Sequence, residues 1–401
     1  MTPFADFTYF GLLLYIVLPT LVLGWFGRAN ARWALFATVL AIAVQCSDDI
    51  PIVSRWHLRE IWIVVGYVVW QAVIACSFLR WKSRATFYVS IALAIVPLVG
   101  AKAFITHEPG IEFGFGMSYA TFRALDVIFS IHDGVIKALS PVKYLAFLLF
   151  FPTISSGPID RYRRFTQDYD HRRTRAEFLN DLDLAVDRIF RGFLYKFIVA
   201  ALIRTYWMDR LETAHDGLHL TGYMYAYSLY LFFDFAGYSA FAVGLSHLFG
   251  IRSPENFDRP FLSRNIRDFW NRWHISLSFW FRDHIYMRFL IAAAKGKWFK
   301  GRHTASYIGL WLTFGLMGVW HGLEPHFLLY GAYHAALLCA YDTFARWNKQ
   351  MKRWPDTRPW RIAYVILTFH VVCFGLLIFS GKLTQKPSPA AASPPAAAAP
   401  Q

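Results

Sequence analysis

Long apolar blocks separated by short basic loops are the feature that most constrains how this chain can fold. A helix needs about 20 residues to cross the hydrocarbon core of a bilayer, and several blocks approach or reach that length. Only 17% of the residues are charged, whereas soluble domains carry about 25%. We therefore predict an all-α polytopic membrane protein. The blocks run at about Tyr9–Phe26, Trp33–Cys46, Ile61–Leu79, Thr86–Phe104, Tyr144–Ile154, Ile189–Trp207, Tyr223–Phe249, Tyr307–Trp320, Phe327–Phe344 and Ile362–Phe379.

The loops between these blocks predict their orientation. The formal net charge is +15, and retention of Lys and Arg in the cytoplasm explains this charge better than nucleic-acid binding does. Alternation places the N-terminus outside, and the first block lacks the basic start and cleavage site of a signal peptide. The basic loops contain Arg28/Arg32, Arg80/Lys82/Arg84, Arg161–Arg175, Arg252–Arg272, Lys295–Arg302 and Arg346–Arg361, and the poorer or acidic loops contain Asp48/Asp49, His107–Glu112 and Asp209–Asp216.

Two passages are irregular. Tyr144–Ile154 falls short of a full span unless Ile128–Val142 contributes to it, so we expect a broken or re-entrant passage. Asp187–Trp207 carries four basic side chains, which predicts that it lies against other helices or near an interface. These side chains are Arg188, Arg191, Lys196 and Arg204.

The segment Trp270–Ile291 breaks the alternation, because basic loops flank it on both sides. We predict a re-entrant or in-plane helix at the cytoplasmic surface, and the alternative is a core helix with a polar seam. The helical spacing that predicts one polar stripe on this helix is that of Asn271, His274, Ser278 and Arg282.

The chain shows one predicted membrane domain, at residues 1–380, and no internal repeat. Residues 381–401 are rich in Pro and Ala and cannot build a core, so we expect a disordered tail. The cysteines show no CxxC spacing and predict neither a disulfide framework nor a zinc site. They are Cys46, Cys76, Cys339 and Cys373.

His321 is the most informative ionisable residue. It lies at the end of an apolar run, and the next run begins after only a few residues, so we expect a tight turn between two helices. A neutral imidazole in a water-accessible pocket there can take a proton from a hydroxyl nucleophile. From this pattern alone, a structural histidine bonded to a backbone carbonyl is the commoner outcome.

Three further residues are candidates. His274 is either functional or an interfacial histidine among anchoring tryptophans. His334 shares a helical stripe with Tyr330 and Tyr341 and is expected to make packing hydrogen bonds. Asp234 lies in the middle of an apolar block and needs a partner, which we expect to be an arginine.

Known motifs of other enzyme classes do not fit this sequence. The chain contains no Walker loop, no HExxH and no GxSxG motif. His321 and His326 are badly spaced for a shared metal, so no metal site is predicted. A transporter is the main competitor, because buried His and Asp in broken helices also mark ion pathways.

Several blocks, in order, resemble the membrane-bound O-acyltransferase family, and among its branches the DltB-type proteins of D-alanyl transfer. The amino-acid sequence of Ile154–Asp160 and the residues around Asn256 and Arg264 favour that branch. Acetyltransferases of exported polysaccharides such as alginate remain the alternative. The resemblance extends from about Pro3 to Phe379. The blocks that carry it are Phe151–Phe165, Phe232–Gly250, Pro254–Phe257, Phe261–His274, Ser276–Asp283 and Trp320–Gly322.

The resemblance implies a ring of helices, with re-entrant or in-plane helices, around a central funnel and tunnel in a bacterial cytoplasmic membrane. It implies that D-alanine passes from a thioester on the phosphopantetheine arm of a cytoplasmic carrier protein to a hydroxyl at the outer face. No tightly bound cofactor is implied. The acceptor is teichoic acid, another surface polymer, or a tyrosine or serine of a downstream membrane partner.

In this family the histidine of the W-H-G turn is the catalytic residue and the R-W-H histidine is the second functional one. Carried over, His321 is the base and His274 supports it. Further supporting residues are Asn271, Trp273, Asp234 and Trp320, with Asn271 and Trp273 as candidate donors to the oxyanion.

The carrier-docking surface is inferred from the residues themselves. An acidic carrier with an apolar edge suits a basic rim around an apolar patch, and lipid anchoring of the same helix is the alternative. The predicted patch and rim are Met287, Leu290, Ile291, Arg288 and Lys295.

Overall fold

Helices are the only regular elements in the part of the chain that the structure describes, which confirms the all-α prediction. This computed structural model describes Phe4 and residues 7–27, 32–45, 58–105, 116–211, 216–301, 303–351 and 353–384. Cys46, the predicted loops at 48–49 and 107–112, and the tail after Thr384 lie outside these residues. Five described helices are long and apolar enough to cross a membrane: Phe7–Trp25, Ile61–Arg80, Arg84–Ala103, Gly217–Leu248 and Arg358–Phe379.

The chain divides into two compact units, and α10 (Gly217–Leu248) contributes to both. The first unit comprises Met1–Tyr195, Phe235–Asp258 and His274–Trp280, and the second comprises Lys196–Asp234, Arg259–Trp273 and Phe281–Gln401. We call them the first unit and the second unit and describe each by itself.

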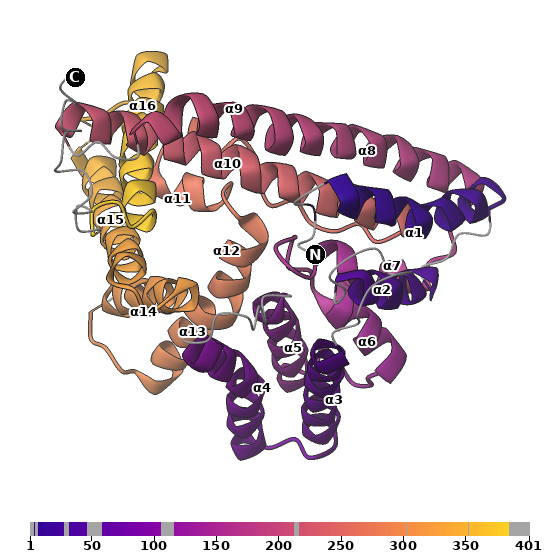
Figure 1. Cartoon of the computed structure of the whole chain (residues 1–401). Helices are drawn as coiled ribbons and strands as arrows, with labels where there is room; N and C mark the ends of the chain where they lie inside the picture. The colour runs from indigo at the N-terminus through magenta and orange to yellow at the C-terminus, as the bar shows by residue number, and fades with distance from the viewer. Residues whose placement is uncertain are drawn as a thin grey trace, which may run out of the picture. The chain divides into compact units, whose positions relative to one another are not determined.

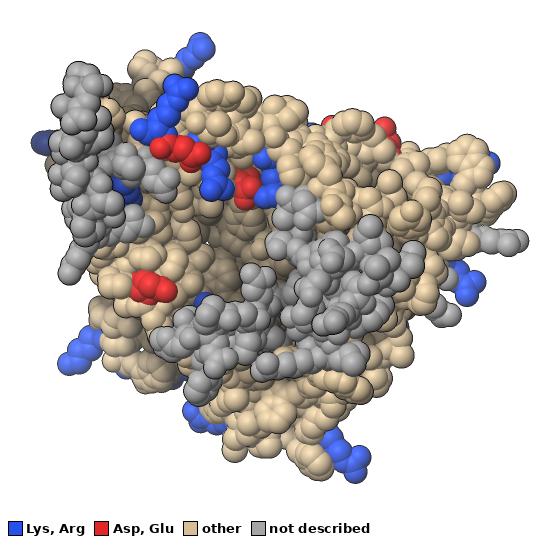
Figure 2. All heavy atoms as spheres, viewed as in Figure 1, with Lys and Arg blue, Asp and Glu red and all other residues tan. Residues whose placement is uncertain are grey.

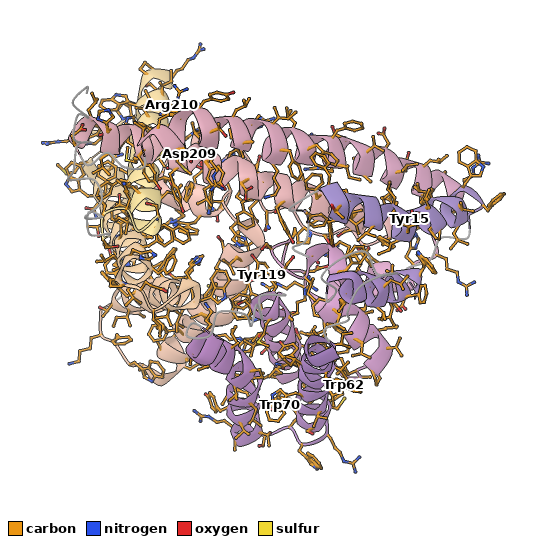
Figure 3. All side chains as sticks on the ribbon, in the orientation of Figure 1. Tyr15, Trp62, Trp70, Tyr119, Asp209 and Arg210 are labelled. Atoms are coloured by element: carbon orange, nitrogen blue, oxygen red, sulfur yellow. The ribbon has the colours of Figure 1, made fainter. Side chains whose placement is uncertain are left out.

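The first unit is built mostly from consecutive helices. Within it, α3, α4 and α5 pack on one another, and α1 packs along α8 (Figure 1). Trp62 and Trp70 project from α3 and are 70% and 41% exposed (Figure 3), as expected of aromatic side chains that meet lipid or the interface. The helices are α1 (Phe7–Trp25), α2 (Arg32–Gln45), α3 (Leu58–Arg80), α4 (Arg84–Ile105), α5 (Met117–His132), α6 (Pro141–Leu149), α7 (Tyr162–Asp170) and α8 (Arg175–Phe193), and α12 (Ile275–Phe281) belongs to it up to Trp280.

The short passage at Tyr144–Ile154 is broken, as predicted. α6 ends at Leu149 and a 3₁₀ turn, η1 (Phe151–Thr153), follows. The stretch 128–142 does not extend α6, because α5 ends at His132 and α6 begins at Pro141.

Arg123 of α5 closes this break. Its side chain is 1% exposed and donates to the carbonyl oxygens of Phe147, Leu148 and Thr153 at 3.0, 3.2 and 2.8 Å. A helix end leaves carbonyl groups without helical partners, and lipid offers none. A buried guanidinium therefore makes an irregular backbone possible here.

Among its described residues, the second unit contains three π-helical stretches, the first of which begins in the first unit, a short α11 and a C-terminal hairpin of long helices. In the hairpin, a Cβ at Gly318 would lie 2.6 Å from the carbonyl oxygen of Phe327, and one at Gly331 would lie 2.4 Å from that of Phe314. Glycine therefore permits the close approach of α14 and α15 (Figure 1). The elements are η2 (Leu194–Ala200), α9 (Ala201–Ile203), η3 (Arg204–Met208), η4 (Asp209–Leu211), η5 (Pro260–Leu262), α11 (Ile266–Trp270), η6 (Arg282–Tyr286), α13 (Met287–Gly296), α14 (Thr304–His321), α15 (Pro325–Met351) and α16 (Arg358–Phe379).

The helix predicted at Trp270–Ile291 forms only from Ile275 onward, so its predicted start is wrong. α11 ends at Trp270, α12 begins at Ile275, and a π-helical stretch, η6, precedes α13. His274 adopts φ 44°, in the left-handed region that interrupts a helix. The polar stripe predicted from helical spacing therefore does not form across 271–274.

The described part of the face drawn in Figure 2 is mostly uncharged. Lys, Arg, Asp and Glu side chains occupy little of the described surface in Figure 2. Large apolar side chains such as Leu14, Val69 and Ile366 are more than half exposed, at 60%, 54% and 54%. Such a surface suits a protein whose solvent is lipid.

Candidate active site

His321 is the last residue of α14, and α15 begins four positions later, at Pro325. The predicted tight turn between two helices is therefore confirmed. A Cβ at Gly322 would lie 2.1 Å from a carboxylate oxygen of Glu324 and 2.6 Å from the ring of Phe327. The turn can close this tightly because glycine occupies the position after the histidine.

Aromatic rings surround the His321 imidazole within the second unit. Its ring centroid lies 4.5 Å from that of Trp320, 4.9 Å from Phe379, 5.9 Å from Phe327 and 6.2 Å from Tyr330. The side chain remains half-buried and not enclosed. An imidazole held by rings but still reachable is suited to take a proton from a hydroxyl group and to pass it on.

His274 belongs to the first unit and is 4% exposed. Its Nε2 lies 3.4 Å from the Tyr119 hydroxyl oxygen, and the ring of Phe235 meets it edge-on at 4.8 Å. His274 is therefore buried within the first unit, and Tyr119 and Phe235 are two of its neighbours. Figure 3 shows Tyr119 at the end of α5, a partner that sequence reasoning missed.

A hydrogen-bonded chain holds the backbone at His274 in its kinked form. The next residue, Ile275, donates its N–H to the carbonyl of Asn256 at 2.9 Å. The Asn256 side chain accepts from Ser276 at 2.6 Å and donates to Ser239 at 3.0 Å. Asn256 is 0% exposed, so the motif Pro254–Phe257 contributes a buried side chain that holds the backbone next to His274.

The motif Phe151–Phe165 is held within the first unit by ion pairs in which the carboxylates are buried and the arginines are partly exposed. Arg161 donates to Asp126 at 2.8 Å and to the carbonyl of Phe279 at 3.3 Å. Asp160 accepts from the Arg161 backbone N–H and pairs with Arg164. Burial raises the pKa of Asp160, and the neighbouring Arg164 opposes this rise.

The supporting residues differ in their surroundings. Asn271 is exposed at the end of α11. Trp273 is 5% exposed and packs against Phe269 at 5.5 Å and Phe261 at 6.1 Å. Trp320 is half-buried beside His321. The Trp320 ring therefore contacts the candidate base.

Asp234 pairs with Lys196 and not with an arginine, which corrects the expected partner. The Lys196 Nζ lies 2.5 Å from the carboxylate, and the two side chains are 17% and 33% exposed. Lys196 lies in the π-helical stretch η2, whose wider turn changes which side chains share a face. Helical spacing in the sequence therefore could not identify this pair.

The predicted docking residues form a partly exposed apolar face on α13. Met287 and Ile291 are 42% and 50% exposed, and Leu290 is half-buried. Lys295 is exposed, and Arg288 is half-buried. Sequence reasoning missed Trp298, which is 56% exposed directly after the helix.

Among the described residues, no group of three or more His, Cys, Asp or Glu side chains is arranged to hold a metal ion.

Comparison with known proteins identifies the family. The model of the membrane-bound O-acyltransferase family matches residues 112–380. The chain is 44% identical to the teichoic acid D-alanyltransferase of Bacillus subtilis, over 95% of this chain and 98% of that protein. It is 38% identical to the protein of the same name from Lacticaseibacillus rhamnosus, over 96% and 98%.

A second group of relatives carries a different name. The chain is 32% identical to the probable alginate O-acetylase of Azotobacter vinelandii, over 81% of this chain and 61% of that protein. Both groups are named for acyl transfer, and the family match includes the motifs of His274 and His321. This all-α, multi-pass membrane protein is an acyltransferase that belongs to the membrane-bound O-acyltransferase family.

Proposed function

We propose that this protein transfers D-alanine from a carrier-protein thioester to a hydroxyl acceptor on teichoic acid, directly or through a downstream membrane partner. The observation that carries this proposal is the 44% identity to a teichoic acid D-alanyltransferase over 95% of the chain. The acetylase of Azotobacter vinelandii is matched over only 61% of its length. This difference favours D-alanyl transfer over acetylation of an exported polysaccharide.

The reaction needs a base and a positioned thioester. The His321 imidazole takes the proton of the acceptor hydroxyl while the oxygen of that hydroxyl attacks the thioester carbonyl carbon. The carbon–sulfur bond then breaks, and the proton passes from His321 to the leaving phosphopantetheine thiolate. Because a thioester is already activated, positioning and this proton transfer supply most of the catalysis. His274 supports the reaction, and Asn271 and Trp273 are the candidate oxyanion donors.

The carrier docks on the apolar face of α13 in this proposal. Met287, Ile291 and Trp298 offer exposed apolar surface, and the exposed Lys295 and Lys297 add positive charge. An apolar centre with a basic rim suits an acidic carrier, because charge speeds association and apolar burial stabilises the complex.

We place the protein in a bacterial cytoplasmic membrane with its N-terminus outside and these basic segments in the cytoplasm. Cysteine labelling in a cysteine-free background tests this orientation. Arg264→Cys and Lys300→Cys change exposed residues on the two sides of Trp270–Ile291, and both should react only from the cytoplasm. Arg210→Cys should react only from outside. Labelling of the first two from opposite sides would overturn the proposed in-plane passage.

Catalysis is tested with purified protein and carrier loaded with labelled D-alanine. His321→Ala should lower the transfer rate by about 10²–10⁴-fold, as expected for loss of a general base. His326→Ala changes a nearby histidine at the start of α15 and should transfer at nearly the wild-type rate. A folded His321→Ala protein with wild-type transfer would remove His321 from the mechanism, and preferred use of acetyl donors by the wild type would favour the acetylase alternative.

Docking is tested by titrating the loaded carrier into each variant. Ile291→Asp places a carboxylate in the proposed interface and should weaken binding, because the charge would be buried against an apolar edge. Ala292→Asp adds the same charge at an exposed position about 100° further around the helix and should bind nearly normally. Equal affinity of both variants would place the dock elsewhere.

A further inference from the structure

His334 is a buried histidine that the proposed mechanism does not use. It lies on α15 and is 0% exposed. The indole Nε1–H of Trp270, at the end of α11, donates to its Nδ1 at 3.3 Å. This contact confirms the packing hydrogen bond expected for His334, and it ties α15 to the helix that leads into the R-W-H motif.

The hydrogen bond sets the state of the His334 ring. An indole N–H can only donate, so Nδ1 must be the acceptor and the proton of the neutral ring is on Nε2. Nε2 faces α16 at Gly375, where a Cβ would lie only 2.7 Å away. Both ring nitrogens are therefore closely surrounded: Trp270 donates a hydrogen bond to Nδ1, and Gly375 leaves room for Nε2.

A continuous set of ring contacts runs from His334 to the candidate base. The ring of Tyr330 lies 4.5 Å from His334 and 6.2 Å from His321. Phe379 completes the set, 5.1 Å from Tyr330 and 4.9 Å from His321. All these residues belong to the second unit. Close-packed rings cannot shift singly, so the orientation of Tyr330 restricts that of His321.

We propose that His334 is a positioning residue for acyl transfer: by accepting the Trp270 hydrogen bond it fixes Tyr330 and thereby the orientation of the His321 imidazole. A phenylalanine or leucine would fill the same space but would leave the buried indole N–H without its acceptor. Packing alone therefore does not explain why a residue with a polar nitrogen occupies this position. The inference rests on the acyl transfer proposed above.

Four variants of the full-length protein test this role. His334→Leu keeps the bulk and removes the acceptor, whereas His334→Asn keeps an oxygen close to the place of Nδ1. Trp270→Phe removes the donor. His370→Leu is the matched control, because His370 is an exposed histidine on α16 of the same unit.

Steady-state transfer from loaded carrier gives the first measurement. His334→Leu should lower kcat by about 10- to 100-fold, with KM for the carrier changed by less than about twofold. Trp270→Phe should behave similarly, the double variant should be no slower than the slower single one, and His334→Asn should recover most of the rate. Wild-type kcat in a folded His334→Leu protein, or an Asn variant as slow as the Leu variant, would overturn the proposal.

A second measurement needs no acyl substrate. Diethyl pyrocarbonate modifies accessible imidazoles, and mass spectrometry of the His321 peptide gives the rate at this residue. The rate should change in His334→Leu and Trp270→Phe and stay at the wild-type value in His334→Asn and His370→Leu. An unchanged rate in every variant would overturn the positioning role. If the wild type transfers no D-alanine, the proposed function fails, but this measurement still decides the role of His334.

Discussion

Each unit contains an irregular segment, and the two segments are held in place by different kinds of interaction. In the first unit, charged groups do this: the buried Arg123 caps the break after α6, and the partly exposed Arg161 with the buried Asp126 holds the motif that follows it. In the second unit, aromatic rings surround the turn at His321, and Trp270, Tyr330 and Phe379 continue the packing.

The difference follows from what each irregularity exposes. A helix broken at membrane depth leaves carbonyl oxygens that need donors, and a guanidinium carries five N–H groups. The turn at His321 instead has its backbone bond, from the Gly322 N–H to the Gly318 carbonyl at 3.2 Å. It needs the orientation of one ring, which other rings supply by shape. Charge therefore repairs the backbone in the first unit, and packing orients a side chain in the second.

The largest effect should come from Arg123→Leu. Each carbonyl left without a donor costs about 1–3 kcal/mol, and three of them together are a large part of the 5–15 kcal/mol that typically stabilises a folded protein. We expect little folded protein by size-exclusion chromatography in detergent. Arg191→Leu removes an exposed arginine of the same unit and should cost about 0.5 kcal/mol or less. Normal folding of Arg123→Leu would contradict the proposed capping.

Loss of the buried Arg173–Asp181 pair should be the next largest effect in the first unit. The two side chains are 4% and 5% exposed and lie 3.1 Å apart. Burial alone would raise the pKa of Asp181, but hydrogen bonds from His247 and Arg173 outweigh it and lower the pKa. Asp181→Asn leaves a buried guanidinium unpaired and should cost about 3–5 kcal/mol, measured by thermal unfolding in detergent.

The pH dependence gives this prediction a second check. A lowered folded-state pKa means that the stabilisation is present above the unfolded value, near 3.9, and is lost as the pH falls through the folded value. The difference between wild type and Asp181→Asn should therefore be constant from about pH 8 to about pH 5 and shrink below about pH 4. A difference that already changes between pH 8 and pH 6 would contradict its assignment to the Asp181 carboxyl group.

In the second unit, Gly331→Ala tests packing without any change of charge. Its Cβ would meet the carbonyl oxygen of Phe314 at 2.4 Å, so α14 and α15 must separate. Overpacking of this kind costs about 1–3 kcal/mol and should also slow transfer, because α14 carries His321. Gly315→Ala is the control, since nothing lies within 4 Å of its Cβ. Equal melting temperatures of the two variants would show that the hairpin is not tightly packed.

The smallest effect should come from removing both members of the Lys196–Asp234 pair. The two side chains are 17% and 33% exposed, and partly exposed pairs contribute about 0–1 kcal/mol. Lys196→Met/Asp234→Leu should unfold near the wild-type temperature, whereas Asp234→Leu alone should be less stable because it leaves the lysine unpaired. A double variant less stable than the single one would show that charge matters in the second unit as it does in the first.

The sequence by itself determined the local and periodic features. Long apolar runs predict helices, a short run predicts the break at Tyr144–Ile154, and two runs separated by a few residues predict the turn at His321. These features depend on neighbours along the chain, so composition and spacing are enough to find them. The assignment of catalytic roles came from the resemblance of several motifs to one family, which the comparisons support at the level of the family.

Only the tertiary structure decided which side chains meet. Helical spacing predicted a polar stripe through His274, but the kink at φ 44° buries this histidine against Tyr119, 155 positions away in the sequence. Spacing also could not show that Asp234 pairs with Lys196, because a π-helical stretch shifts the face on which the lysine lies. Arg123 likewise meets carbonyl groups 24 to 30 positions away. Such contacts depend on how distant segments pack, and a residue pattern along the chain contains no direct record of that packing.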